Sequence, residues 1–340
     1  MKIIYYQSPD GNFGDDLNDV LWKELLSPAC FEADDAVLLG VGSIFRDEFL
    51  SQQATESKRV FVLGSGAGTG PLPSRWPNAD WSILAVRGPL TASLIGLPQA
   101  AITDSAALLA TTPGLLPKAV PRHEIAFMPH YNSVLYSRWP DIAKDVGLTY
   151  IDAHWPVEKI LDHMSRARLM VTEAMHGAIV ADTLRIPWVP VISSPAILPF
   201  KWVDWTESLD LDYRPLTLPA SSAWEALKHF KIRTVDGDKG MDGLSDRDED
   251  ILDDFYRRYG GLSGGSPMPK RVVTSGQASK LQKLTAVFDR TFSDRAAQAL
   301  VAASKSQPYL SKDNVFAERV ERLQGAVAKL ERALVGMTVH

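Results

Sequence analysis

The sequence has a single cysteine, Cys30, in 340 residues. One thiol excludes an internal disulfide and a zinc site built from thiolates, and it is typical of a reducing compartment. No apolar run approaches the ~20 residues that a membrane-spanning helix needs. The segment that follows Met1 is also too short for the apolar part of a signal peptide. We therefore expect a cytoplasmic protein.

An overall excess of positive charge is also absent, because 36 Lys and Arg residues stand against 41 Asp and Glu, for a formal net charge of -5. This balance gives no reason to expect nucleic acid as a partner. The charge is uneven, since residues 275–340 carry a net +4 and the remainder carries -9. The chain is 45% hydrophobic, which is typical of a folded protein, and its length predicts about two domains.

Short apolar runs alternate with amphipathic segments over the first two thirds of the chain. Such alternation predicts parallel strands joined by helices. The expected strands form two series, at 2–6, 36–39, 60–63, 82–86 and 101–103, and at 124–128, 149–152, 169–172 and 188–192. The expected helices are 16–26, 89–94, 157–165 and 175–184.

Two such series predict an α/β protein with two doubly wound, Rossmann-like domains that face each other across a cleft. We place the first domain at residues 1–112 and the second at 118–262, with a proline-containing linker within 111–122. Residues 246–259 are expected to be helical and 263–269 to form a flexible connection. In doubly wound folds, ligands bind beyond the carboxyl ends of the strands.

A helical C-terminal extension is expected at residues 275–340, with helices at 280–303 and 314–334. In the second helix, apolar residues recur at alternating steps of four and three, at Phe316, Val320, Leu323, Val327, Leu330 and Leu334. This heptad seam predicts a homodimer through the C-terminal helices. A helical hairpin packed on the body of the protein is one alternative, and a basic amphipathic helix on an anionic membrane is another.

Polar residues follow the first expected strand in the segment Gly11-Asn12-Phe13-Gly14-Asp15-Asp16-Leu17-Asn18. Glycines at this junction let a ligand approach the backbone. Asn12, Asp15 and Asp16 stand near the start of the first expected helix, where acidic residues also act as caps. Capping alone requires neither two aspartates nor two glycines, so we interpret the segment as part of a site.

Two further loops follow strands of the first series. Residues 64–70 are rich in glycine, but prolines follow where a dinucleotide-binding helix would begin. We predict a mobile or ligand-lining loop that contains Ser65, with a simple turn as the alternative. Arg87 ends the next strand, beside the expected helix start at Pro89. A fixed cation near free helix N–H groups suits a carboxylate or a phosphate.

The most informative motif runs from Val171 to Ile179, includes Glu173 and Gly177, and joins an expected strand to an expected helix. It places His176 in the first turn of that helix, where unpaired N–H groups and the helix dipole favour phosphate. An imidazole there is able to donate to a phosphate oxygen or to act as a general acid. A buried structural histidine is the alternative. His130 follows another strand end of the same series.

The seven histidines show no HExxH or HxxxH spacing, and the sequence contains no GxSxG or Walker motif. We therefore predict neither a metal ion nor a cofactor. Trp188, Trp202 and Trp205 are either an aromatic wall for a sugar or residues of the core.

Together these motifs resemble the polysaccharide pyruvyl transferase family, and within it the bacterial exopolysaccharide ketal pyruvyltransferases of the succinoglycan type. Each motif is common, but their order within residues 1–192 is fairly specific. The matching segments are Asn12-Phe13-Gly14-Asp15, Gly40-Val41-Gly42-Ser43, Leu63-Gly64-Ser65-Gly66, Val86-Arg87-Gly88-Pro89, Asp104-Ser105-Ala106, Pro129-His130 and residues 173–179.

The resemblance implies a GT-B-like fold, phosphoenolpyruvate as the donor substrate and a saccharide with two hydroxyls as the acceptor. We accordingly expect His176 to act as a phosphate ligand and general acid, and Asp15 as the base for the acceptor hydroxyl. The expected binding residues are Arg87, His130, Glu173, Gly177, Ser65, Asn12 and Asp16. Many relatives carry Arg-Leu-His where this chain has Ala174-Met175-His176. The candidates to replace the missing arginine are Lys201, Arg185, Arg168 and His130.

Two other functions fit the same expected fold. One is a GT-B glycosyltransferase that uses a nucleotide sugar, which requires a carboxylate for the ribose hydroxyls, and the sequence offers no clear candidate. The other is a non-catalytic assembly protein with a vestigial site. The expected partners are thus phosphoenolpyruvate and a saccharide. A lipid-linked saccharide would give the basic extension a role in peripheral contact with the inner membrane.

Overall fold

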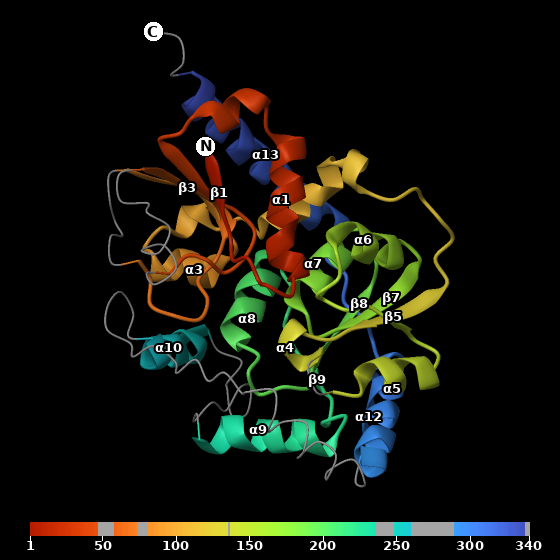
Figure 1. Cartoon of the computed structure of the whole chain (residues 1–340). Coiled ribbons are helices and arrows are strands. Elements are labelled where there is room, and N and C mark those ends of the chain that lie inside the picture. The colour runs from red at the N-terminus through yellow and green to blue at the C-terminus, as the bar shows by residue number, and fades with distance from the viewer. Residues whose placement is uncertain (47–57, 74–79, 135–136, 236–247, 260–288, 337–340) are drawn as a thin grey trace.

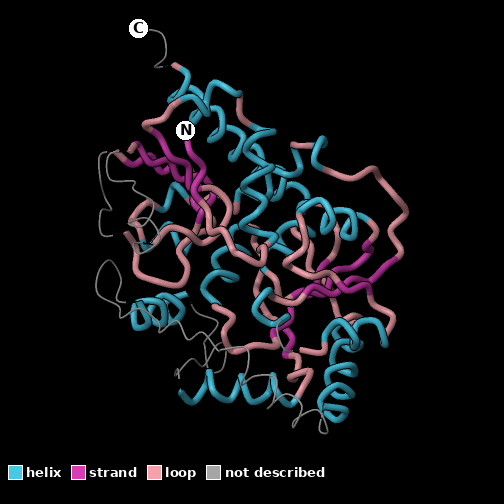
Figure 2. Tube along the Cα trace, viewed as in Figure 1, coloured by secondary structure: helices cyan, strands magenta, loops and turns pink. Residues whose placement is uncertain are grey.

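The computed structural model of the chain describes residues 1–46, 58–73, 80–134, 137–235, 248–259 and 289–336. It shows a mixed α/β protein in which helices surround two parallel sheets (Figures 1 and 2). The connection expected at 263–269 lies outside the described residues. Within the described ranges, no helix combines the length and the apolar character needed to cross a bilayer.

The first sheet consists of β1 (Lys2–Ile4), β2 (Ala36–Leu39), β3 (Arg59–Ser65) and β4 (Trp81–Val86), paired in parallel in that order. Each strand adds to the same edge, so the described part of this sheet lacks the reversal of a doubly wound topology. The strand expected at 101–103 is reduced to a single bridge between Val86 and Ala101. α1 (Phe13–Leu25) follows β1, and α3 (Pro89–Leu94) follows β4.

The second sheet consists of β5 (Glu124–Met128), β6 (Thr149–Tyr150), β7 (Ala167–Thr172), β8 (Trp188–Ile192) and β9 (Leu216–Thr217), in the order β6-β5-β7-β8-β9. The chain places β6 on one side of β5 and β7 on the other, so the strand order reverses there. Ligands of doubly wound sheets bind beyond the strand ends at such a reversal. α4 (Tyr131–Val134) follows β5, and α7 (Met175–Thr183) follows β7.

Seven further helical elements complete the described part of the two halves. They are η1 (Pro28–Glu32), η2 (Pro98–Ala100), η3 (Ser105–Thr111), η4 (Pro113–Leu115), α5 (Trp139–Asp145), α6 (Val157–Ser165) and α9 (Ala223–Val235). η3 contacts both α1 and α7, so it lies where the two halves meet.

Three helices that follow β8 in the chain pack on the first half. α8 (Pro199–Ser208) contacts α3, α10 (Asp248–Tyr259) contacts both α8 and α3, and α13 (Asp313–Val335) contacts β3 and β4. Buried Asp204 on α8 accepts hydrogen bonds from the backbone N–H and the hydroxyl of Thr91, at 2.8 and 2.6 Å. The first half therefore includes contacts with helices from much later in the chain. The domain boundaries at 112 and 118 stay a prediction.

The C-terminal extension divides between the two halves rather than forming a hairpin. α12 (Asp289–Ala303) packs on α5, whereas α13 packs on the first sheet behind α1 (Figure 1). All six residues of the expected coiled-coil seam are at most 8% exposed and belong to the largest core cluster. The seam therefore packs against other residues of the same chain, and this face of α13 is not available for a parallel dimer.

Candidate active site

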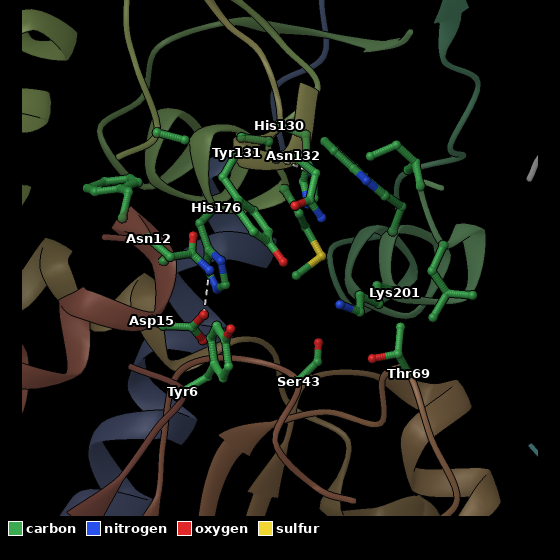
Figure 3. Close-up of a pocket in the computed structure, with 18 of the residues that line it drawn as sticks. Tyr6, Asn12, Asp15, Ser43, Thr69, His130, Tyr131, Asn132, His176 and Lys201 are labelled. Carbon is green, nitrogen blue, oxygen red and sulfur yellow. Dashed lines mark hydrogen bonds between the residues drawn. The ribbon is translucent and has the colours of Figure 1, made fainter. Parts of the chain in front are cut away.

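A cavity of about 360 Å³ lies between the two halves (Figure 3). Its walls come from segments that follow strands of both sheets, since the carboxyl ends of parallel strands share one edge. The polar lining residues include Asn12, Asp15, Ser43 and Thr69 from the first half and His130, Asn132, His176 and Lys201 from the second. In Figure 3, Asp15 and His176 lie at one end of the cavity, and Lys201 and Thr69 lie at the other.

The start of α1 delivers Asn12 and Asp15 to the cavity. Asn12 is the N-cap, and its backbone N–H donates to a carboxylate oxygen of Asp16 at 2.9 Å, while its side-chain amide donates to Asp15. Gly11 precedes them in the left-handed backbone region, at φ +84°. Glycine is also required there by space, because a Cβ would lie 2.7 Å from the His154 carbonyl oxygen. Asp16 therefore completes the helix cap and does not line the cavity, whereas Asp15 does.

Asp15 is the carboxylate of the cavity. It is only 8% exposed, and burial raises its pKa to about 6, an effect that the nearby charges of His176 and Lys201 partly offset. Gly42, at φ +115°, leaves room for it, because a Cβ there would lie 2.8 Å from the Asp15 Oδ1 atom. A carboxyl group with this pKa is a proton acceptor near neutral pH.

His176 is the second residue of α7 and meets the start of α1. A Cβ on Gly14 would lie 1.9 Å from the His176 Nδ1 atom, so the imidazole packs directly over Gly14. The opposite ring nitrogen, Nε2, lies 3.6 Å from the Asp104 Oδ2 atom. The imidazole thus spans from the cavity wall to a buried carboxylate of the first half.

His130 follows β5 and lines the cavity at the strand reversal. Its Nδ1 accepts the Asn132 N–H at 3.3 Å, which leaves the ring hydrogen on Nε2. Burial lowers the pKa of His130 to about 3, and the positive charges of Lys201 and Lys228 add to this effect. The ring is therefore a neutral hydrogen-bond donor at physiological pH.

Glu173 and Gly177 support the site from behind, and neither lines the cavity. Glu173 is 1% exposed and accepts hydrogen bonds from His130 N–H, from Ser193 N–H and hydroxyl, and from Ser194 N–H. It thereby ties together the loops after β5, β7 and β8. A Cβ on Gly177 would lie 2.6 Å from the Thr172 Oγ1 atom, so glycine lets α7 sit close to the strand end.

Lys201 on α8 is one of the four candidates expected from the sequence to replace the missing arginine. It lines the cavity, and burial lowers its pKa to about 8, with a further contribution from Arg87. Arg185 instead binds Asp182, Ser311 and Asp313 away from the cavity, and Arg168 is exposed on β7. No pattern around Lys201 in the sequence singled it out.

Arg87 was expected to bind the anionic substrate, but its side chain does not line the cavity. It is fully buried, and its guanidinium donates to Asp204 at 3.0 Å, to the Ser43 hydroxyl at 2.6 Å and to the Ala67 carbonyl at 2.7 Å. The pairing with Asp204 turns the side chain toward α8, so Arg87 reaches the cavity only through Ser43. Ser65 is also buried, and its hydroxyl donates to the Gly42 carbonyl at 3.0 Å.

The tryptophans belong to the core rather than to a sugar-binding wall. Trp188 and Trp205 are at most 1% exposed, with their ring centroids 5.2 Å apart. Trp202 is 2% exposed and stacks on Tyr213, although it also contributes to the cavity wall. Among the described residues, no three His, Cys, Asp or Glu side chains gather as a metal site requires.

The cavity thus combines a cation, a neutral imidazole donor and a carboxylate with a raised pKa. Such a set suits an anionic substrate and a proton transfer from a hydroxyl. The family model for polysaccharide pyruvyl transferase matches residues 4–195, which contain most of the cavity wall.

The chain is also similar to the succinoglycan biosynthesis protein ExoV of Rhizobium meliloti (strain 1021). The two are 36% identical over 339 residues, which cover 98% of this chain and 99% of that protein. A match over more than half of the chain and a relative aligned along nearly its whole length lead to the same assignment. The chain belongs to the polysaccharide pyruvyl transferase family and is a transferase.

Proposed function

We propose that the protein transfers the pyruvyl group of phosphoenolpyruvate to a saccharide of an exopolysaccharide, or of its lipid-linked precursor, and forms a pyruvate ketal. The acceptor class is supported by the succinoglycan relative. The donor is supported by one observation, which is that Lys201, His130 and His176 share a cavity with the carboxylate of Asp15. The two sheets around this cavity are proposed to form a GT-B-like pair.

Phosphoenolpyruvate carries a carboxylate and a phosphate on three carbons, so it requires at least two anchors that are cationic or rich in N–H groups. Lys201 supplies an ammonium group and His130 supplies a neutral donor. The first turn of α7, at Met175 and His176, adds unpaired backbone N–H groups at the cavity wall. Arg87 fixes the position of Ser43 in the cavity wall through a hydrogen bond to its hydroxyl.

In the proposed reaction, His176 donates a proton to the methylene carbon of the donor. Asp15 accepts the proton of one acceptor hydroxyl, and that oxygen bonds to the central carbon of the donor. The bond from this carbon to the bridging phosphate oxygen then breaks, and the second hydroxyl adds to the same carbon. One hydroxyl proton is thus balanced by the new methyl hydrogen, and the other leaves with phosphate.

Calorimetric titration with phosphoenolpyruvate and, separately, with uridine diphosphate tests the donor. We expect phosphoenolpyruvate to bind and uridine diphosphate to give no signal. Phosphate release with an exopolysaccharide oligosaccharide from which pyruvate has been removed tests the transfer, and the methyl signal of the ketal in the proton NMR spectrum identifies the product. Binding of the nucleotide alone would favour a glycosyltransferase, and binding of neither would favour a non-catalytic protein.

A further inference from the structure

Asp104 is a fully buried carboxylate that the reaction described above does not use. It caps η3 at the end of the first half, where its Oδ1 accepts the Ala106 N–H at 2.9 Å. Its second oxygen, Oδ2, is buried and has no hydrogen-bond partner in the described structure. A buried carboxylate oxygen without a partner is costly, so its surroundings call for an explanation.

The atom that faces Asp104 Oδ2 is the Nε2 of His176, at 3.6 Å. This nitrogen is also buried and also lacks a hydrogen-bond partner. Two unsatisfied buried atoms of complementary character therefore point at each other across the boundary between the halves. The contact between η3 and α7 brings them together, although they are 72 residues apart in the sequence.

The other ring nitrogen of His176 lies near the cavity wall. The His176 Nδ1 atom lies over Gly14 at the start of α1, and both residues line the cavity wall. Asp15, which lines the cavity, lies close enough for the charge of His176 to lower its pKa. The two nitrogens of the ring therefore have different surroundings, with Nε2 against the buried carboxylate and Nδ1 against the start of α1.

We infer that Asp104 is the positioning residue for His176. A hydrogen bond from Nε2–H to Oδ2 fixes the orientation of the ring and its tautomer, and it leaves Nδ1 to exchange the proton with the substrate. A carboxylate at this place holds the imidazole in one orientation during the proton transfer. The inference deepens the proposed function and rests on it for the role of His176.

Asp104→Asn tests this assignment with little change of shape. The amide oxygen is able to keep the cap on η3, while the amide N–H₂ group replaces Oδ2 and donates to Nε2. The ring hydrogen then moves to Nδ1, which is the wrong tautomer. We expect kcat to fall by about 100-fold or more, while the Kd for phosphoenolpyruvate changes by less than about threefold.

Nitrogen NMR of the histidine side chains reads the tautomer directly, with the His176 signal assigned from a His176→Gln sample. The neutral ring should carry its hydrogen on Nε2 in the wild-type protein and on Nδ1 in Asp104→Asn. The wild-type measurement does not depend on the folding of the Asp104→Asn variant. A wild-type ring with its hydrogen on Nδ1 would overturn the inference.

A double-mutant cycle separates positioning from a merely structural role. If Asp104 acts through His176, Asp104→Asn changes kcat by less than about twofold when His176 is already alanine. Ser105→Ala, the neighbouring buried position, serves as the matched control and should leave kcat unchanged. A full additional loss in the His176→Ala background contradicts the inference. Absence of turnover in the wild-type protein would contradict the proposed function, while the tautomer measurement still decides the role of Asp104.

Discussion

The imidazole of His176 rests on the α-carbon of Gly14, and a Cβ built on Gly14 would lie 1.9 Å from its Nδ1 and 2.4 Å from its Cγ. Gly14 belongs to α1 in the first half, and His176 belongs to α7 in the second. The starts of two helices therefore meet because one of them lacks a side chain. The glycine is required by this close approach and not by an unusual backbone conformation.

Gly14→Ala should displace the imidazole and lower kcat by about 100-fold, since a shift of roughly 1 Å in a catalytic group has this effect. Steady-state kinetics measures the loss, and circular dichroism checks that α1 persists. Gly325→Ala on α13 is the matched control, because a Cβ added at this position would meet nothing within 4 Å. It should stabilise the protein by about 1 kcal/mol and leave kcat unchanged. A Gly14→Ala enzyme with normal kcat would remove His176 from the mechanism.

Lys201→Met should weaken the binding of phosphoenolpyruvate and raise its KM by about 10- to 100-fold, because one charge-assisted contact is lost. The melting temperature should stay the same or rise, since burial disfavours the charged form of this lysine. Calorimetry and thermal unfolding measure the two effects. An unchanged KM would exclude Lys201 as a donor ligand.

Arg87→Met provides a contrast with Lys201→Met. Its guanidinium is buried against Asp204, so its removal leaves a buried carboxylate without its ion pair and should lower the free energy of unfolding by about 3–5 kcal/mol. Urea denaturation measures the change. A variant of normal stability with a raised donor KM would show that Arg87 contacts the substrate after all.

The pH dependence of kcat/KM should be bell-shaped, because this parameter reports groups of the free enzyme. Activity should rise with pH through about 6, as Asp15 loses its proton and becomes a base. It should fall through about 8, as Lys201 loses its charge. Lys201→Arg should move the descending limb to higher pH, because arginine stays protonated. A descending limb that does not move in this variant contradicts the assignment to Lys201.

Asp15→Asn should stabilise the protein at pH 8 while lowering its activity. The pKa of Asp15 is about 6 in the folded protein and 3.8 in the unfolded reference, so the folded state binds more protons between these values and loses stability as pH rises through them. The difference of about two pKa units corresponds to about 3 kcal/mol. Melting temperatures at pH 8 and pH 4 measure the effect. An equal gain at both values would exclude a buried charge as its cause.

Local pattern was sufficient to predict most elements of the two sheets. The strands at 36–39, 124–128 and 188–192 and the helices at 89–94 and 157–165 have the bounds that the apolar runs and prolines indicate. α1 begins three residues earlier than expected, because Asn12 rather than Asp15 is its N-cap. The coiled-coil interpretation failed because an apolar seam does not specify whether its partner is a second chain or the same one.

The residues of the candidate site were likewise predicted only in part from the sequence. Asn12, Asp15, His130 and His176 line the cavity as expected, since each follows a strand end of a parallel sheet. Asp16, Ser65, Arg87, Glu173 and Gly177 also stand near strand ends, but they do not line the cavity. The direction of a side chain depends on its partner, and the partner of Arg87 is Asp204, 117 residues later in the chain.

The sequence by itself determined which residue types stand at the strand ends, because alternating apolar runs and helix caps act over a few neighbouring positions. The tertiary structure alone decided that Lys201 lines the cavity, that Glu173 supports its loops and that Asp104 faces His176. These relationships depend on how α7, α8 and η3 pack between the halves. Packing joins residues that no short-range pattern connects.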